Sequence, residues 1–128
     1  MKRTQGFTTI EIIVAIVFLG AVATLLFIQR NNLVAADRDG QRKTAINAMY
    51  YNLEEVFHAK NGYYPATIDK TKLTAMDPEL FNDPNGKTLG SSESNYRYDG
   101  VNCNNDQCKG YTLRADLEKE DDFVKTNR

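Results

Sequence analysis

The sequence contains few of the residues on which enzymes commonly depend. It has one histidine, His58, no tryptophan and only two cysteines among 128 residues. Its serines, Ser91, Ser92 and Ser94, are confined to one short stretch. Neither a glycine-rich phosphate loop nor a His-x-x-x-His pair occurs. No catalytic constellation can be assembled from these residues, so the sequence predicts a protein that is not an enzyme.

The chain also lacks an excess of charge of either sign. Sixteen basic residues oppose 17 acidic ones, which leaves a formal net charge of −1. This balance does not indicate a protein that binds nucleic acid over its whole surface. A chain of this length supports one domain.

One long apolar segment, from Phe7 to Ile28, interrupts this otherwise polar sequence. As a helix it would be about 33 Å long at roughly 1.5 Å per residue, enough to cross a hydrocarbon core of about 30 Å. Lys2 and Arg3 precede it and no acidic residue does. The positive-inside rule therefore predicts a cytoplasmic N-terminus, with the chain after Ile28 on the outer side of the cytoplasmic membrane.

Glu11 is the unusual member of this segment. A carboxylate near the centre of a membrane helix costs about 2.5–3.5 kcal/mol, and less near an end. The surrounding Leu, Ile, Val and Phe residues outweigh that cost, so the segment inserts in spite of Glu11. A charged residue within a membrane is by default functional and needs a partner. A free α-amino group at Phe7, with a pKa near 8, would provide one.

The N-terminal residues resemble the class III signal of type IV pilins and pseudopilins. The motif is a short basic leader, Lys2-Arg3-Thr4-Gln5-Gly6, followed by Phe7-Thr8-Thr9-Ile10-Glu11. The resemblance implies cleavage after Gly6 by a membrane prepilin peptidase, N-methylation of Phe7, and filament assembly through Glu11. Its implied partners are further pilin subunits and an inner-membrane assembly platform.

Other interpretations of the same segment remain open. A secretory signal peptide could be cleaved near Ala21-Val22-Ala23 or Ala35-Ala36, although the apolar run is long for that role. A plain anchor for an extracytoplasmic binding domain fits the hydropathy but leaves Gly6 and Glu11 unexplained. Within the pilin class, the alternative to a pilus subunit is a pseudopilin of a type II secretion system.

The predicted fold class is α+β, with a long N-terminal helix packed against a small antiparallel sheet. One continuous helix is expected from Phe7 to about Asn61, because apolar residues recur at steps of three and four from Ile46 to Phe57 and Asn61-Gly62 provides a terminating signal. Alternating residues predict strands at 95–99 and 110–117 and a short one at Phe123-Val124. The expected segments are a leader at 1–6, a membrane-spanning helix at 7–28, an amphipathic helix at 29–61 and a globular head at 62–128.

Cys103 and Cys108 fall in the expected connection between the two strands. An even pair of cysteines on the outer side of a membrane predicts a disulfide. The closed loop is short, so the chain-entropy contribution is about 2 kcal/mol. The alternative is a metal site formed by these thiols with His58, but two cysteines without a second ligand pair are a weak zinc signal.

Two further surface sites are weaker hypotheses. The acidic residues Asp116, Glu118, Asp121 and Asp122 could provide oxygen ligands for Ca²⁺, as in the major pseudopilins that this chain resembles, although no EF-hand spacing is present. A solvated acidic face is the simpler interpretation. The basic residues Arg97, Lys109 and Arg114 could form a small DNA-binding patch, as some competence pilins require.

Overall fold

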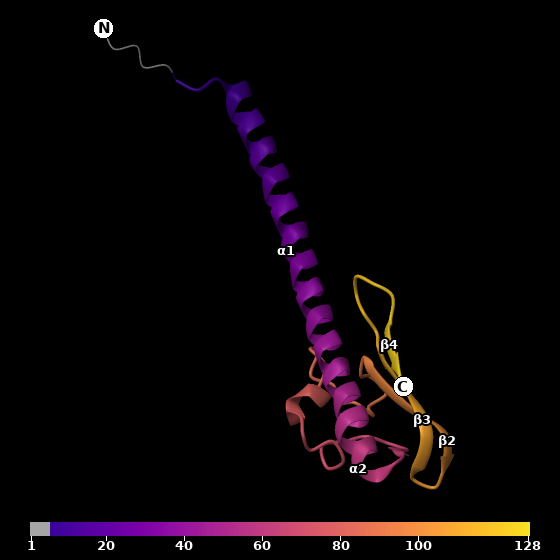
Figure 1. Cartoon of the computed structure of the whole chain (residues 1–128). Coiled ribbons are helices and arrows are strands. Elements are labelled where there is room, and N and C mark those ends of the chain that lie inside the picture. Colours follow the sequence, from indigo (N-terminus) through magenta and orange to yellow (C-terminus); the bar gives the residue numbers. More distant parts are fainter. Residues whose placement is uncertain (1–5) are drawn as a thin grey trace. The chain divides into compact units, whose positions relative to one another are not determined.

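A computed structural model describes residues 6–128 of the chain, so the predicted leader residues Lys2 and Arg3 lie outside the described residues. The chain divides into two compact units, with the boundary in the sequence between Val34 and Ala35. Helix α1 spans Thr9–Tyr51, and a π-helical segment, η1 (Asn52–His58), and a last short turn, α2 (Ala59–Asn61), continue it without interruption. Figure 1 shows these elements.

The helix ends as the sequence predicts, at Asn61, with Gly62 in the left-handed conformation at φ 77°. It begins two residues later than predicted, at Thr9 rather than Phe7. Thr8 causes this difference, since its hydroxyl oxygen accepts the N–H of Glu11 at 3.3 Å and its carbonyl accepts the N–H of Ile12 at 3.2 Å. Thr8 therefore occupies the N-cap position, outside the regular helix.

The π-helical segment was not predicted. Asn52, Leu53 and Glu54 are consecutive and all buried, which the narrow apolar stripe of a regular α-helix does not produce. The wider turn of a π-helix changes the angular spacing of successive side chains, so that Glu54 joins Leu53 on the buried side. Val56, which the apolar pattern from Ile46 to Phe57 places on the buried face, is instead 38 % exposed.

The second unit contains a four-stranded antiparallel sheet, as the predicted α+β class requires. Its strands are β1 (Tyr64–Pro65), β2 (Tyr96–Asn104), β3 (Gln107–Ala115) and β4 (Phe123–Thr126). Strand β3 is central, with β2 on one side and both β1 and β4 paired to the other. The β2–β3 hairpin is longer than predicted, and only Asn105 and Asp106 separate its strands.

The core of this unit lies between the later part of α1 and the inner face of the sheet. The 66–95 connection, which includes the 3-10 turn η2 (Pro78–Phe81), closes the remaining sides. As the helical periodicity predicts, Ile46, Met49 and Leu53 are fully buried. The other buried apolar side chains are Ala45, Tyr64, Ile68, Leu73, Phe81, Tyr96, Cys108, Tyr111, Leu113 and Ala115. The result is the long helix and small antiparallel sheet of a pilin-like architecture.

Candidate functional site

The candidate assembly site lies at the start of α1. Gly6 is exposed, with no atom of the described residues beyond its chain neighbours within 4 Å of where a Cβ would stand, and Phe7 is 78 % exposed. Within the described part of the chain, both residues of the predicted cleavage bond are therefore exposed. Glu11 is exposed in the first turn of the helix.

Thr8 and Glu11 together form part of a helix cap that was not predicted from the sequence. A threonine followed three residues later by glutamate is the signature of a capping box, in which each side chain serves the backbone N–H of the other residue. The Thr8 half of this arrangement is formed. Glu11 is thus placed by the helix start, one turn from Phe7, and its carboxylate also lies where the positive end of the helix dipole favours an anion.

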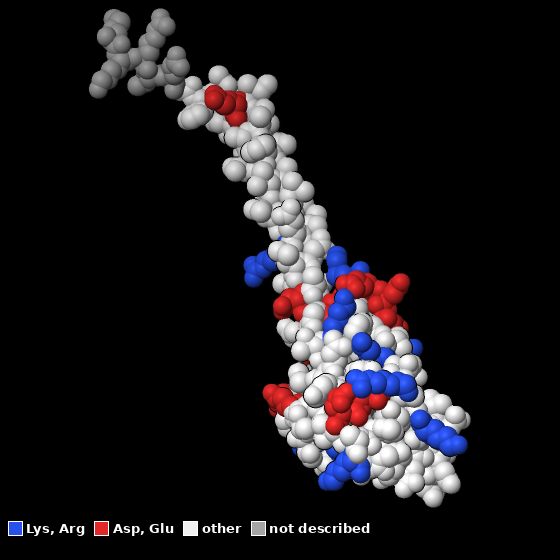
Figure 2. Space-filling view, in the orientation of Figure 1, with Lys and Arg blue, Asp and Glu red and all other residues white. Residues whose placement is uncertain are grey.

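The helix that follows is long and apolar enough to cross a membrane, and its apolar residues have no cover within the chain. Between Ile12 and Ile28 the helix has no charged residue, and Glu11 is the acidic residue of its first turn. Figure 2 shows an acidic group near the start of the helix. Large side chains on every side of the helix are exposed, including Ile10, Val17, Leu25 and Phe27. A helix that is apolar all round is expected in lipid or among other apolar helices. Together with the disulfide, this helix suggests a membrane-attached chain with an extracytoplasmic domain.

The disulfide between Cys103 and Cys108 is present, which confirms that prediction and excludes the alternative thiol metal site. The two cysteines are direct partners in the β2–β3 register, rather than members of a loop. Gly100 lies against the bridge, because a Cβ there would stand 2.7 Å from Cys108 Sγ and 2.8 Å from Cys103 Sγ. The missing side chain at Gly100 makes room for the sulfur atoms.

The four acidic candidates for Ca²⁺ are not gathered around one point. Glu118 forms a bidentate ion pair with Arg38, at 2.8 and 3.0 Å, while Asp116 and Asp122 each lie 3.8 Å from Arg114. Within residues 6–128, no cluster of three or more His, Cys, Asp or Glu side chains could hold a metal ion. Three of the four carboxylates thus lie beside an arginine.

The basic candidates for DNA are only partly brought together. Arg97 and Arg114 are register partners on neighbouring strands, whereas Lys109 lies further along β3 toward the hairpin turn. The two carboxylates beside Arg114 offset part of its charge. DNA binding stays a prediction.

Two polar networks in the second unit have no clear signal in the sequence. In the first, the buried carboxylate of Asp39 accepts the N–H groups of Glu118 and Lys119, both at 2.8 Å, and pairs with Arg42. Burial alone would raise the pKa of Asp39, but these hydrogen bonds and Arg42 outweigh it and hold the pKa below its usual value. The hydrogen bond from Arg38 lowers the pKa of Glu118 as well. This network ties residues 118–122, the acidic segment, to α1.

The second network surrounds Glu54 in η1. Its carboxylate accepts hydrogen bonds from the phenols of Tyr64 at 3.0 Å and Tyr111 at 2.9 Å, and from the backbone N–H of Arg128 at 3.3 Å. Burial, with the bond to Glu54, raises the pKa of Tyr64 to about 12. His58 stacks on Tyr64 with ring centroids 4.5 Å apart. Glu54 therefore links the helix to β1, β3 and the chain end, which is a structural role.

Comparisons with protein-family models, curated proteins and solved structures found no match to this chain.

Proposed function

We propose that this chain is a structural subunit of a type IV pilus or a related type IV filament, cleaved after Gly6 and assembled through its N-terminal helices. The observation that carries this proposal is the exposed apolar helix with an acid in its first turn. Apolar surface on this scale needs lipid before assembly, and the helices of other subunits can replace that lipid afterwards.

Glu11 gives the helix more than an anchoring role. An anchor gains nothing from a carboxylate, which opposes insertion. In a bundle of such helices, the new α-amino group of Phe7 in one subunit can pair with Glu11 of its neighbour, and an ion pair in low dielectric is strongly favoured over two separated charges. Glu11 thus favours association between copies at the expense of insertion of the single copy.

Cleavage and assembly each require a protein partner. A prepilin peptidase in the cytoplasmic membrane removes the leader and frees the Phe7 amine, which is then methylated. An inner-membrane assembly platform moves the subunit from the membrane into a filament of identical or related pilins. The second unit, with its disulfide, is then displayed outside the cytoplasmic membrane.

The test compares the membrane pool with the sheared surface fraction for wild type and Glu11→Leu. The variant should insert and be cleaved normally, because the leader and Gly6 are unchanged, but it should be depleted from the sheared fraction. Leu25→Ala, also in the exposed helix, is the matched control and should still assemble. A membrane-anchored binding domain predicts the opposite result, with Glu11→Leu harmless in every assay. Normal filaments from Glu11→Leu subunits would refute the proposal.

A further inference from the structure

The second unit contains a groove of about 590 Å³ between α1 and the segment that includes η2. One wall is an exposed face of α1, on which the small residues Ala36, Gly40 and Thr44 recur at every fourth position. Leu80 and Pro84 provide apolar surface on the opposite wall. A helix with small residues permits close approach by another helix, and the apolar wall offers area to bury.

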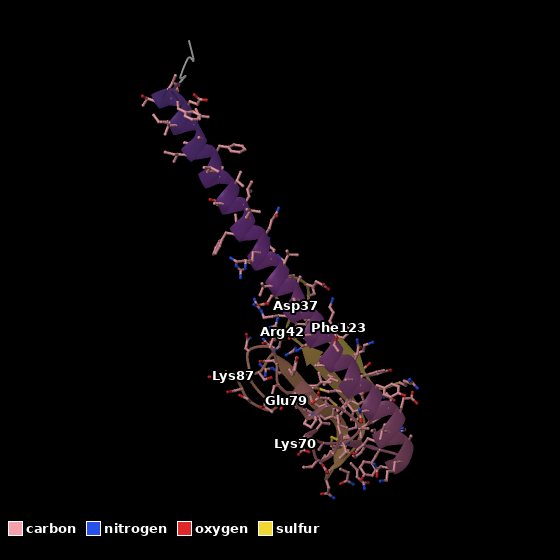
Figure 3. All side chains as sticks on the ribbon, turned by 90° about the vertical axis from the view of Figure 1, so that its left-hand side faces the viewer. Asp37, Arg42, Lys70, Glu79, Lys87 and Phe123 are labelled. Atoms are coloured by element: carbon pink, nitrogen blue, oxygen red, sulfur yellow. A yellow bond between two sulfur atoms is a disulfide. The ribbon has the colours of Figure 1, made fainter. Side chains whose placement is uncertain are left out.

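Three acids line this groove. Asp83 is buried and its carboxylate accepts three backbone N–H groups, whereas Asp37 on α1 and Glu79 in η2 stand on opposite walls. Figure 3 labels both on the face of the second unit turned toward the viewer. Asp37 accepts a hydrogen bond from Gln41 and Glu79 accepts one from Asn82, but neither pairs with a cation among residues 6–128. The groove therefore combines apolar surface with two carboxylates, those of Asp37 and Glu79, that form no ion pair with a described residue.

The basic residues next to the groove are already used. Arg38 and Lys43 pair with Glu118 and Glu120, and Arg42 pairs with Asp39, all on the side of α1 that faces the acidic segment. They cannot neutralise Asp37 without breaking those pairs. An occupant of the groove must bring its own cation.

This chain has one exposed helical segment with the complementary chemistry. Arg30 has no ion-pair partner among the described residues. Leu33 and Val34 follow at three and four positions, so they share its helix face. Leu33 is 72 % exposed although the polar residues Asn31 and Asn32 precede it. A cation and an apolar side chain thus project together from residues 29–34.

The other unpaired cations fit the groove less well. Lys70 borders the same cavity as Glu79 within its own chain, and Lys60 lies in the last helical turn, where the helix dipole favours a cation. Arg97 and Lys109 are held in strands of the β2–β3 hairpin. None of these combines a free cation with a neighbouring exposed leucine on a helix.

We propose that the groove binds residues 29–34 of a second copy of this chain, with Leu33 of that copy against Leu80 and Pro84 and with Arg30 beside Asp37. This contact rests on the proposed filament function and assigns residues to it. Two different surfaces meet, so the contact is heterologous and can repeat in an open polymer. Parallel helices staggered by seven residues, about 10 Å at roughly 1.5 Å per residue, place Arg30 level with Asp37 and Leu33 level with Gly40.

Cysteine crosslinking in the full chain tests the apolar half of this contact. Leu33→Cys combined with Leu80→Cys should give a ladder of covalent multimers from filaments on a non-reducing gel, whereas each single substitution should not. Leu33→Cys combined with Ser92→Cys is the matched control, because Ser92 is exposed but lies outside the groove, and it should give no ladder. Filaments in which the 33/80 pair forms no ladder overturn the contact.

A charge exchange tests the polar half. Asp37→Arg should reduce polymer about tenfold or more, as expected when like charges meet in an interface. Adding Arg30→Asp should recover part of that loss, while Asp99→Arg, an exposed acid on β2, should have no effect. No recovery in the double variant overturns the contact. A wild-type chain that leaves no polymer overturns the proposed function itself, whereas wild-type polymer without crosslinks or recovery overturns only this contact.

Discussion

The backbone N–H of Glu11 donates a hydrogen bond to the hydroxyl oxygen of Thr8, at 3.3 Å. The acid that opposes membrane insertion therefore also belongs to the first turn of the helix. This geometry gives Glu11 two separable roles. Its side chain can complete a capping box, which needs only a hydrogen-bond acceptor, or pair with an amine of another subunit, which needs a negative charge.

Glu11→Gln separates the two roles. Glutamine can still complete the capping box, so a local role for residue 11 would leave assembly intact. The assembly role requires the charge, and we expect Glu11→Gln to be nearly as deficient in the sheared filament fraction as Glu11→Leu. Thr8→Ala, which removes the cap but keeps the charge, should cost about 0.5–2 kcal/mol of helix stability and assemble better than Glu11→Gln. Normal assembly of Glu11→Gln would assign residue 11 to the cap.

Processing should take place at the bond between Gly6 and Phe7. N-terminal sequencing or intact-mass measurement of the protein from cells should show a mature chain that begins at Phe7 and carries one methyl group. Gly6→Leu should retain the leader. The leucine side chain would obstruct the peptidase at the cleavage bond, where the wild-type glycine has no side chain. A mature chain that begins after Ala23 or Ala36 would instead indicate an ordinary secretory signal peptide.

Gly100 should be intolerant of a side chain while the disulfide is present. A Cβ at this position would overlap both sulfur atoms, and overpacking of this kind typically costs about 1–3 kcal/mol of unfolding free energy. Gly100→Ala should therefore lower the midpoint of denaturant unfolding. In a Cys103→Ser, Cys108→Ser background the same substitution should cost less, since two unlinked serines can move apart.

The disulfide itself contributes to stability by a separate route. Cys103→Ser combined with Cys108→Ser should lower the free energy of unfolding by about 2 kcal/mol, because the disulfide restricts the unfolded chain. Unreduced wild-type protein should have a mass two hydrogens below that of the reduced chain. If Gly100→Ala lowers the unfolding free energy equally in the wild type and in the double serine variant, the sulfur atoms are not the reason that position 100 excludes a side chain.

The buried carboxylate of Glu54 should make its two phenol donors interdependent. Tyr111→Phe or Tyr64→Phe removes one charge-assisted hydrogen bond each, worth about 1.5–3 kcal/mol. Because both phenols serve one carboxylate, the double substitution should depart from additivity in the free energy of unfolding. Tyr51→Phe is the control, since Tyr51 is 62 % exposed and should change stability little. Additive effects would mean that Glu54 finds other partners.

Lowering the pH should weaken the attachment of the acidic segment to α1. Asp39 and Glu118 have folded-state pKa values below their usual 3.8 and 4.5. For such groups the stabilisation is complete above the unfolded-state pKa and is lost as the pH falls below it. The unfolding free energy should therefore fall from about pH 5 toward pH 2. Glu118→Gln should show a smaller fall over that range, and an unchanged pH profile would contradict this assignment.

The sequence by itself determined the main elements, because each depends on local chemistry. The apolar run predicts the long exposed helix, the spacing of Ile46, Met49 and Leu53 predicts its buried face, and Asn61-Gly62 predicts its end. The alternation in Tyr111, Leu113 and Ala115 likewise predicts the buried face of β3. All of these residues lie as predicted, since a 3.6-residue or two-residue period needs no knowledge of distant contacts.

The tertiary structure decided which distant groups meet. Nothing in the sequence pairs Asp39 with the backbone of Glu118, or Glu54 with Tyr111, since these contacts span 79 and 57 positions. The hairpin length also escaped prediction. Gly100 and Cys103 present their side-chain positions on one side although they are three residues apart, and between them Asn102 has φ 52°. A regular strand alternates sides at every residue. Asparagine adopts a left-handed conformation more readily than most residues, but the alternating sequence pattern does not show that β2 departs from regular strand geometry at this point.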